Sequence, residues 1–138
     1  MALQWKFNGN RAVYLQIMEH IRGAILAGEF PPGSRIPPVR EFAAQAQVNP
    51  NTMQRALLEL EREGLLIACG TTGRFVTDNG AILDAMRLQA VDAAIRASAE
   101  QSKALGLTLS EAAQLLIKLE EEENGSCIAN RRFDEILR

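Results

Sequence analysis

The sequence has little of what enzymes and metal proteins use. Its 138 residues include one histidine and two cysteines. The single histidine, His20, leaves few options for general acid–base chemistry, and no Ser-His-Asp set, metal cluster, phosphate loop or buried acid pair is recognisable. Cys69 and Cys127 lack the spacing of metal ligands, so we expect two reduced thiols. We therefore predict no enzyme, no metal site, no catalytic residue and no cofactor.

Aromatic residues and long apolar runs are also scarce. Aromatics make up 5% of the chain, too few for the stacking platforms that bind single-stranded nucleic acid. No apolar run is long enough to cross a bilayer, and the first residues lack the apolar core of a secretion signal. With 47% hydrophobic and 23% charged residues, the composition is that of a globular protein. These features predict a cytoplasmic protein without a membrane partner.

Charge is nearly balanced overall but unevenly distributed. The formal net charge is −2. Residues 1–77 carry eight Lys or Arg against six Asp or Glu, whereas residues 78–138 carry seven against eleven. The first part is thus positive and the second negative, which suggests that the two parts have different functions.

The first part has the pattern of three helices followed by a β-hairpin. Apolar residues recur at helical spacing in residues 11–28 and 38–46. A third helix is predicted over 50–63, between an Asn–Pro start and a glycine stop. Helical spacing predicts that its buried face consists of Met53, Ala56, Leu57 and Leu60. Two short apolar runs, 65–69 and 74–77, flank the turn GTTG. This order is that of a winged helix-turn-helix, a fold that binds DNA or serves as a protein-interaction module.

The second part reads as two helices without a core of their own. One helical pattern covers 80–104, and Thr108 with Glu111 forms a capping box before the next helix. Two helices cannot enclose a core, so a second copy of the chain is the simplest partner. The predicted dimerisation residues are Ile82, Met86, Ala90, Ala94, Leu109, Ala112, Leu115, Leu116 and Leu119.

The predicted fold class is mainly α with a small β-hairpin. Residues 1–78 form the winged helix-turn-helix DNA-binding domain, and 79–123 form a helical dimerisation and effector domain. Residues 124–138 form a C-terminal tail that begins with turn residues.

The third helix has a polar front and an acidic back. Its front carries hydrogen-bonding groups that suit bases, whereas its back carries Glu59, Glu61 and Glu63. A helix advances about 1.5 Å per residue, so the acids lie roughly 12 to 18 Å behind Asn51. Only the first turns of a recognition helix reach base edges. The acids are then expected to point away from DNA, either paired with Arg62 or Arg22 or forming a solvated face.

Three motifs in this order resemble the GntR family of bacterial transcription regulators, and within it the YtrA subfamily. They are YLQIMEHIRGAILAGEFPPGSRIPPVREFAAQ, VNPNTMQRALLELEREGLL and TTGRFVT. The motifs cover roughly residues 10–77, while the helix pair at 80–122 matches by size and position only. The resemblance implies that 50–63 is the recognition helix in the major groove, that Arg40 contacts DNA, and that GTTGRFV is a wing along the minor groove. It also implies that the helix pair dimerises and binds effectors, and that the regulated operon contains a transporter.

Two departures from the family pattern bear on affinity. The family usually has Pro-Ser-Val-Arg where this chain has Pro37-Pro38-Val39-Arg40, so a serine cap and phosphate contact is missing. The wing usually begins with basic residues, but here it begins with Ala68-Cys69-Gly70. Arg74, beyond the turn, is the candidate to compensate.

We expect a sequence-specific DNA-binding regulator, by family default a repressor, that binds a palindromic operator as a homodimer. Arg55 is the first candidate for a guanine contact. Arg40 is expected to contact the DNA backbone or groove edge, which positions the protein without specifying a sequence. A small-molecule effector, between subunits or domains, stays open. The alternative, suggested by the weakly basic wing, is a protein-interaction module with weak DNA affinity. The expected DNA-binding residues are Arg40, Asn49, Asn51, Thr52, Gln54, Arg55, Thr71, Thr72, Gly73 and Arg74.

Overall fold

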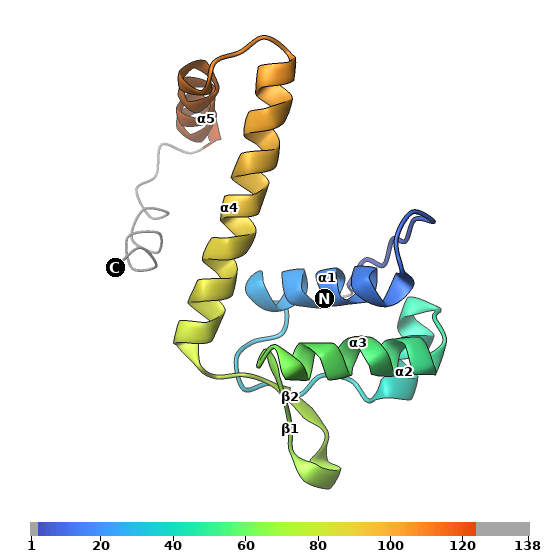
Figure 1. Ribbon diagram of the computed structural model, residues 1–138. Helices are drawn as coiled ribbons and strands as arrows, with labels where there is room; N and C mark the ends of the chain where they lie inside the picture. Colours follow the sequence, from blue (N-terminus) through green and yellow to red (C-terminus); the bar gives the residue numbers. More distant parts are fainter. Residues whose placement is uncertain (1–2, 124–138) are drawn as a thin grey trace. The chain divides into compact units, whose positions relative to one another are not determined.

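The computed structural model describes residues 3–123 and contains, in that range, five α-helices and one two-stranded antiparallel sheet (Figure 1). This architecture confirms the predicted fold class. The predicted tail, 124–138, lies outside the described residues. In chain order the elements are α1 (Val13–Leu26), α2 (Val39–Ala46), α3 (Pro50–Arg62), β1 (Leu66–Ala68), the 3₁₀ turn η1 (Gly70–Thr72), β2 (Arg74–Val76), α4 (Gly80–Ala104) and α5 (Leu109–Glu123).

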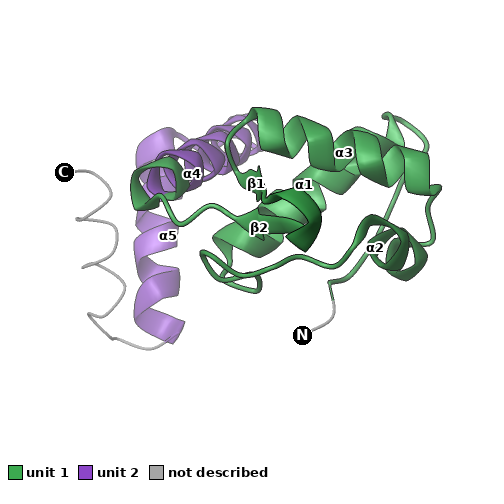
Figure 2. Cartoon of the chain, turned by 90° about the horizontal axis from the view of Figure 1, so that it is seen from below, with its two compact units in different colours: residues 1–83 green, residues 84–138 purple. Residues whose placement is uncertain are grey.

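The chain divides into two compact units, residues 1–83 and 84–138 (Figure 2). The first unit contains α1, α2, α3, the hairpin and the beginning of α4. The second contains the rest of α4 and α5. The predicted domain boundary, after residue 78, lies just before the start of α4, whereas the two units divide within that helix.

The core of the first unit lies between α3 and the two helices packed against it, α1 and α2. Helices α1 and α3 lie side by side and run in the same direction (Figure 1). The predicted buried face of α3 is confirmed, because these side chains are fully buried: Met53, Ala56, Leu57 and Leu60. Ile17 and Ile21 of α1 and Phe42 of α2 complete the centre of this core.

Helix α3 begins and ends where its sequence predicts. The side chain of Asn49 accepts a hydrogen bond from the backbone N–H of Asn51 at 2.8 Å, which caps the helix. Pro50 occupies the first helical position, where its missing N–H costs nothing. The helix ends before Gly64, whose φ of +84° suits glycine.

The hairpin pairs Leu66 with Val76 and Ala68 with Arg74. The turn-rich connection before α2 lies along the other edge of β2. Ser34 accepts a hydrogen bond from the N–H of Val76 at 2.8 Å, and Ile36 donates its N–H to Arg74 at 3.1 Å. This pairing brings the connection, including Arg35, beside the wing.

The predicted capping box at the start of α5 is present. The Glu111 carboxylate accepts from the N–H of Thr108 at 3.1 Å, and the Thr108 hydroxyl accepts from the N–H of Glu111 at 3.2 Å. These hydrogen bonds from the Thr108 backbone and hydroxyl lower the pKa of Glu111. None of the described helices is long and apolar enough to span a membrane.

Candidate nucleic-acid interface

Helix α3 presents one continuous face to solvent. Asn51, Arg55, Leu58 and Arg62 are all exposed and recur at intervals of three or four residues, so they lie in one row along the helix. Asn51 and Arg55 belong to the amino-terminal half of this row. Two other predicted site residues of α3, Thr52 and Gln54, are half-buried.

The amino-terminal end of α3 favours anions through its dipole, which places partial positive charge there. Its first backbone donors are already used, because Pro50 has no N–H, Asn51 donates to the Asn49 side chain, and Thr52 donates to the Asn49 carbonyl at 3.0 Å. Asn49 uses its side-chain oxygen as the cap, and its amide NH₂ makes no hydrogen bond within the described residues. The predicted contact by Asn49 would therefore most simply use this NH₂ as the donor.

The predicted contacts Arg55 and Arg40 are exposed, and neither forms an ion pair with any described residue. The Arg55 guanidinium carbon lies 3.7 Å from the centroid of the Tyr14 ring. Arg40 is in the first turn of α2, whose N-cap, Pro38, provides no side-chain hydrogen bond. The first N–H groups of α2 therefore have no side-chain cap, and the first turn carries both Arg40 and the acidic Glu41.

The wing tip is a short 3₁₀ turn rather than a simple loop. The Thr72 hydroxyl donates to the carbonyl of Cys69, while Thr71 is exposed. Gly73 has a φ of +114°, which L side chains rarely adopt. A Cβ atom added at Gly73 would lie 3.0 Å from Nε of Arg35, so this arginine covers the tip of the wing.

Arg35 is a candidate contact that the sequence does not reveal. It is exposed and forms no ion pair within residues 3–123. Its sequence signal is only that of a basic residue in a proline-rich connection. Its position beside the wing depends on the pairing of that connection with β2. The paired residues, Arg35 and Phe75, lie far apart in the sequence.

Arg74, the predicted compensating residue of the wing, points toward α3. Its Nε donates to the Glu61 carboxylate, and its Nη2 lies 3.4 Å from Oε1 of Gln54. The carboxylate of Glu61 therefore neutralises much of the charge that Arg74 would bring to the wing.

The acidic back of α3 is paired throughout. Glu63 accepts two hydrogen bonds from one nitrogen of Arg22, at 2.7 and 2.8 Å. Glu59 pairs with Arg62 at 2.9 Å, and Glu61 pairs with Arg74. Of the two alternatives that the sequence left open, pairing holds for Glu63 with Arg22 and for Glu59 with Arg62, whereas the partner of Glu61 is Arg74, which the sequence did not suggest.

The arginines near α3 therefore form two groups. The three unpaired arginines are Arg35, Arg40 and Arg55, and the three paired arginines are Arg22, Arg62 and Arg74. Charge that is already paired with a neighbouring carboxylate attracts a polyanion weakly, whereas unpaired charge is fully available. The unpaired arginines are the cations of this surface that suit nucleic acid.

The first unit is similar to a known family of proteins. The model of the family described as bacterial regulatory proteins, gntR family, matches residues 13–76. The HTH-type transcriptional regulator YhcF of Bacillus subtilis is 35% identical over 106 residues, which cover 77% of this chain and 88% of YhcF. The chain belongs to the gntR family.

Two further similarities extend this result. The HTH-type transcriptional repressor YtrA of Bacillus subtilis is 37% identical over 67 residues, 49% of this chain and 52% of YtrA. A GntR family transcriptional regulator from Listeria monocytogenes has a similar structure, with a TM-score of 0.74 and 25% identity over 81% of this chain and 98% of that one. Membership of the gntR family confirms the predicted class, a DNA-binding transcription regulator rather than an enzyme.

Proposed function

We propose that this gntR-family protein is a homodimeric repressor of the YtrA type that binds a palindromic operator. The observation that carries the proposal is the division between unpaired and paired arginines around α3. The unpaired group supplies cations for DNA, and the ion pairs on the back of α3 prevent its acids from repelling the phosphates.

The front of α3 reads bases in the major groove. Arg55 donates two N–H groups to O6 and N7 of a guanine, a contact worth about 1 to 3 kcal/mol of discrimination. Asn51 and Gln54 have the amide groups that recognise adenine, or they hold phosphate. Thr52 donates to phosphate from the first turn of the helix.

The remaining contacts fix the protein on the DNA backbone. Arg40 and the uncapped N–H groups of α2 bind phosphate beside the major groove. Arg35 and Thr71 contact the backbone from the wing, and Thr72 and Gly73 shape its tip. Arg35 thus takes the role that was predicted for Arg74, because Arg74 forms an ion pair with Glu61.

The second unit is proposed to dimerise because it has no core of its own. Among the described residues 84–123, no side chain is buried. A groove of about 330 Å³ runs between α4 and α5, and its lining is almost entirely apolar: Val91, Ala94, Ile95, Ser98, Ala99, Ala112 and Leu116. Burying a leucine-sized side chain stabilises an interface by about 1.5 to 3 kcal/mol. A dimer in which a second copy covers these apolar faces would therefore be strongly stabilised.

The remaining predicted dimerisation residues differ in their surroundings. Leu109, Leu115 and Leu119 of α5 are at least half exposed, and Ala90 is exposed. Ile82 and Met86 are half-buried, and Ile82 lies within the first unit, 3.8 Å from where a Cβ of Gly64 would be. We therefore assign the interface mainly to α5 and to the part of α4 from Ala90 onward.

A two-fold dimer presents two recognition helices to two half-sites about one helical turn apart, so the operator is palindromic. Repression follows if the operator overlaps a promoter, and the similar protein YtrA of Bacillus subtilis is a transcriptional repressor. Control of a transporter operon and a bacterial cytoplasmic location belong to the same proposal. Binding of a small-molecule effector remains an expectation. The apolar groove between α4 and α5 is assigned to the partner subunit rather than to an effector.

Selection from random duplexes tests the DNA-binding part. The protein should enrich a palindromic sequence, and fluorescence anisotropy should give an affinity that falls linearly with the logarithm of salt concentration. The slope counts phosphate contacts. Enrichment of no sequence, with weak and equal binding to all duplexes, would favour the protein-interaction alternative.

Sedimentation equilibrium tests the dimer. Leu116→Asp places a charge in the apolar groove and should convert the dimer to a monomer. Gln114→Asp, on the same helix and exposed, is the matched control and should remain dimeric. Equal behaviour of the two variants would place the interface elsewhere.

A further inference from the structure

The guanidinium of Arg55 stacks on an aromatic ring from another helix. Its Cζ lies 3.7 Å from the centroid of Tyr14, which is in the first turn of α1. Because α1 and α3 run in the same direction, the start of α1 lies beside the base-reading half of α3 (Figure 1). The Arg22–Glu63 ion pair connects the opposite ends of the same two helices.

The stacking leaves the hydrogen-bonding edge of Arg55 available. A guanidinium interacts with a ring through its flat face, whereas its N–H groups donate within its plane. Within the described residues, Arg55 has no hydrogen bond or ion pair that would occupy those groups. Tyr14 therefore restricts the orientation of the guanidinium without competing with a base for its donors.

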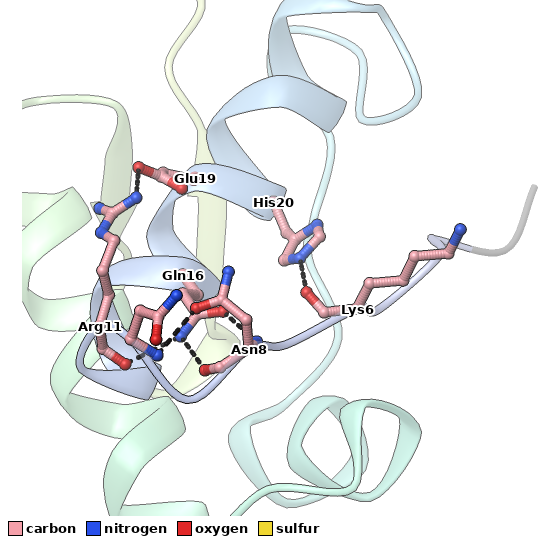
Figure 3. A network of polar contacts seen from close by, with 7 residues as sticks. Lys6, Asn8, Arg11, Gln16, Glu19 and His20 are labelled. Carbon is pink, nitrogen blue, oxygen red and sulfur yellow. Dashed lines mark hydrogen bonds and ion pairs between the residues drawn. The ribbon is translucent and has the colours of Figure 1, made fainter.

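The start of α1, which carries Tyr14, is held by several polar contacts. The buried side chain of Gln16 accepts from the N–H of Asn8 and donates to the carbonyls of Asn8 and Arg11, all at 2.9 Å (Figure 3). Arg11 also pairs with Glu19 at 2.6 Å. These contacts fix the start of α1, and Tyr14 is half-buried on it. The helix end that carries the Tyr14 ring is thus anchored by these contacts.

We propose that Tyr14 is a positioning residue that orients Arg55 for base recognition. Free arginine side chains lose rotamer entropy when they bind, and a side chain that is already oriented loses less. Tyr14 then contributes to sequence discrimination without touching DNA. This inference rests on the proposed role of Arg55 in reading a base.

A double-mutant cycle tests the proposal, with the duplex that the wild-type protein selects from a random library and a scrambled duplex as probes. Tyr14→Leu should weaken binding to the selected duplex by about three- to tenfold, the range of a cation–π contact, and leave the scrambled duplex unaffected. In an Arg55→Ala background, Tyr14→Leu should have no further effect. Tyr14→Phe keeps the ring and should restore binding.

Two controls separate positioning from general structure. Leu15→Ala changes a neighbouring exposed residue and should leave binding unchanged. In the free protein, ring currents should shift the NMR resonance of the Arg55 Nε–H, and this shift should disappear in Tyr14→Leu. If the leucine variant does not fold, Tyr14→Met takes its place.

An equal loss in the Arg55→Ala background would show that Tyr14 acts only on the fold, and an undiminished affinity of Tyr14→Leu would show that it does not act at all. Either result overturns the inference while leaving the proposed function intact. The proposed function fails separately, if the wild-type protein selects no duplex or if Arg55→Ala binds the selected duplex normally.

Discussion

The unpaired and paired arginines of the winged helix differ in whether a carboxylate faces them. Arg55 and Arg62 show the contrast best, because both are exposed on the same row of α3 and lie seven residues apart. Arg62 pairs with Glu59, whereas Arg55 has only the Tyr14 ring. The net charge of the chain, −2, is therefore a poor guide to its DNA affinity, since paired charges largely cancel each other.

Removing two unpaired arginines should have the largest effect. Arg35→Ala combined with Arg40→Ala removes two phosphate contacts per subunit. Each contact should contribute about 0.9 to the slope of log affinity against log salt concentration, and roughly eightfold to the affinity at about 0.1 M salt. The variant should lose affinity for the selected and the scrambled duplex equally. Anisotropy across a salt series measures both quantities. Arg62→Ala, which removes an arginine paired with Glu59, is the control, and an equal loss there would refute the distinction.

Gly73→Ala should disturb the unpaired group indirectly. A φ of +114° costs a residue with a Cβ about 1 to 3 kcal/mol, and the new atom displaces the side chain of Arg35. We expect a lower free energy of unfolding, measured with urea, and weaker binding to both duplexes. Gly23→Ala, in an open position within α1, should raise the stability instead. Normal binding by Gly73→Ala would mean that Arg35 does not contact DNA.

Glu61→Gln should move an arginine from the paired to the unpaired group. The change releases Arg74 from its carboxylate and removes a negative charge, so DNA affinity should rise by about two- to fivefold, mainly at low salt. Glu63→Gln makes the same charge change at the end of α3 and should raise affinity less. Titration of both variants with the scrambled duplex compares them. A larger rise for Glu63→Gln would contradict the proposed direction of α3 on DNA.

Arg22→Ala should have the smallest effect. Its partner, Glu63, is partly solvated, so loss of the ion pair should reduce the free energy of unfolding by no more than about 1 kcal/mol. DNA affinity should stay within about twofold of the wild type, because the pair lies at the far end of α3. Urea denaturation and anisotropy on the same samples provide the two values. A large loss of binding without a loss of stability would move Arg22 into the DNA-contacting group.

Local signals in the sequence predict most of the fold. Asn49, Pro50 and Gly64 act on their immediate neighbours, so the bounds of α3 follow from the residues at its ends. The capping box of Thr108 and Glu111 spans a single turn and was predicted for the same reason. Helical periodicity likewise identified the buried face of α3.

The candidate site was harder to predict because its geometry depends on contacts between distant segments. Arg55, an expected base contact, was identifiable from its place on α3, but its stacking on Tyr14 was not, since the sequence marks that tyrosine as part of an apolar stripe. The pairing of Arg74 with Glu61 and the position of Arg35 beside Gly73 depend on how the hairpin packs. Hydrophobic spacing contains no information on these side-chain directions.

The most direct test compares Arg55→Ala with Arg62→Ala on the selected and scrambled duplexes. Both variants remove one exposed positive charge from the same face of α3, so their long-range electrostatic effects are similar. We predict that Arg55→Ala loses about 1 to 3 kcal/mol of discrimination between the duplexes per half-site, while Arg62→Ala keeps it. Equal losses in the two variants, or a larger loss in Arg62→Ala, would contradict a recognition helix that reads DNA with its amino-terminal half.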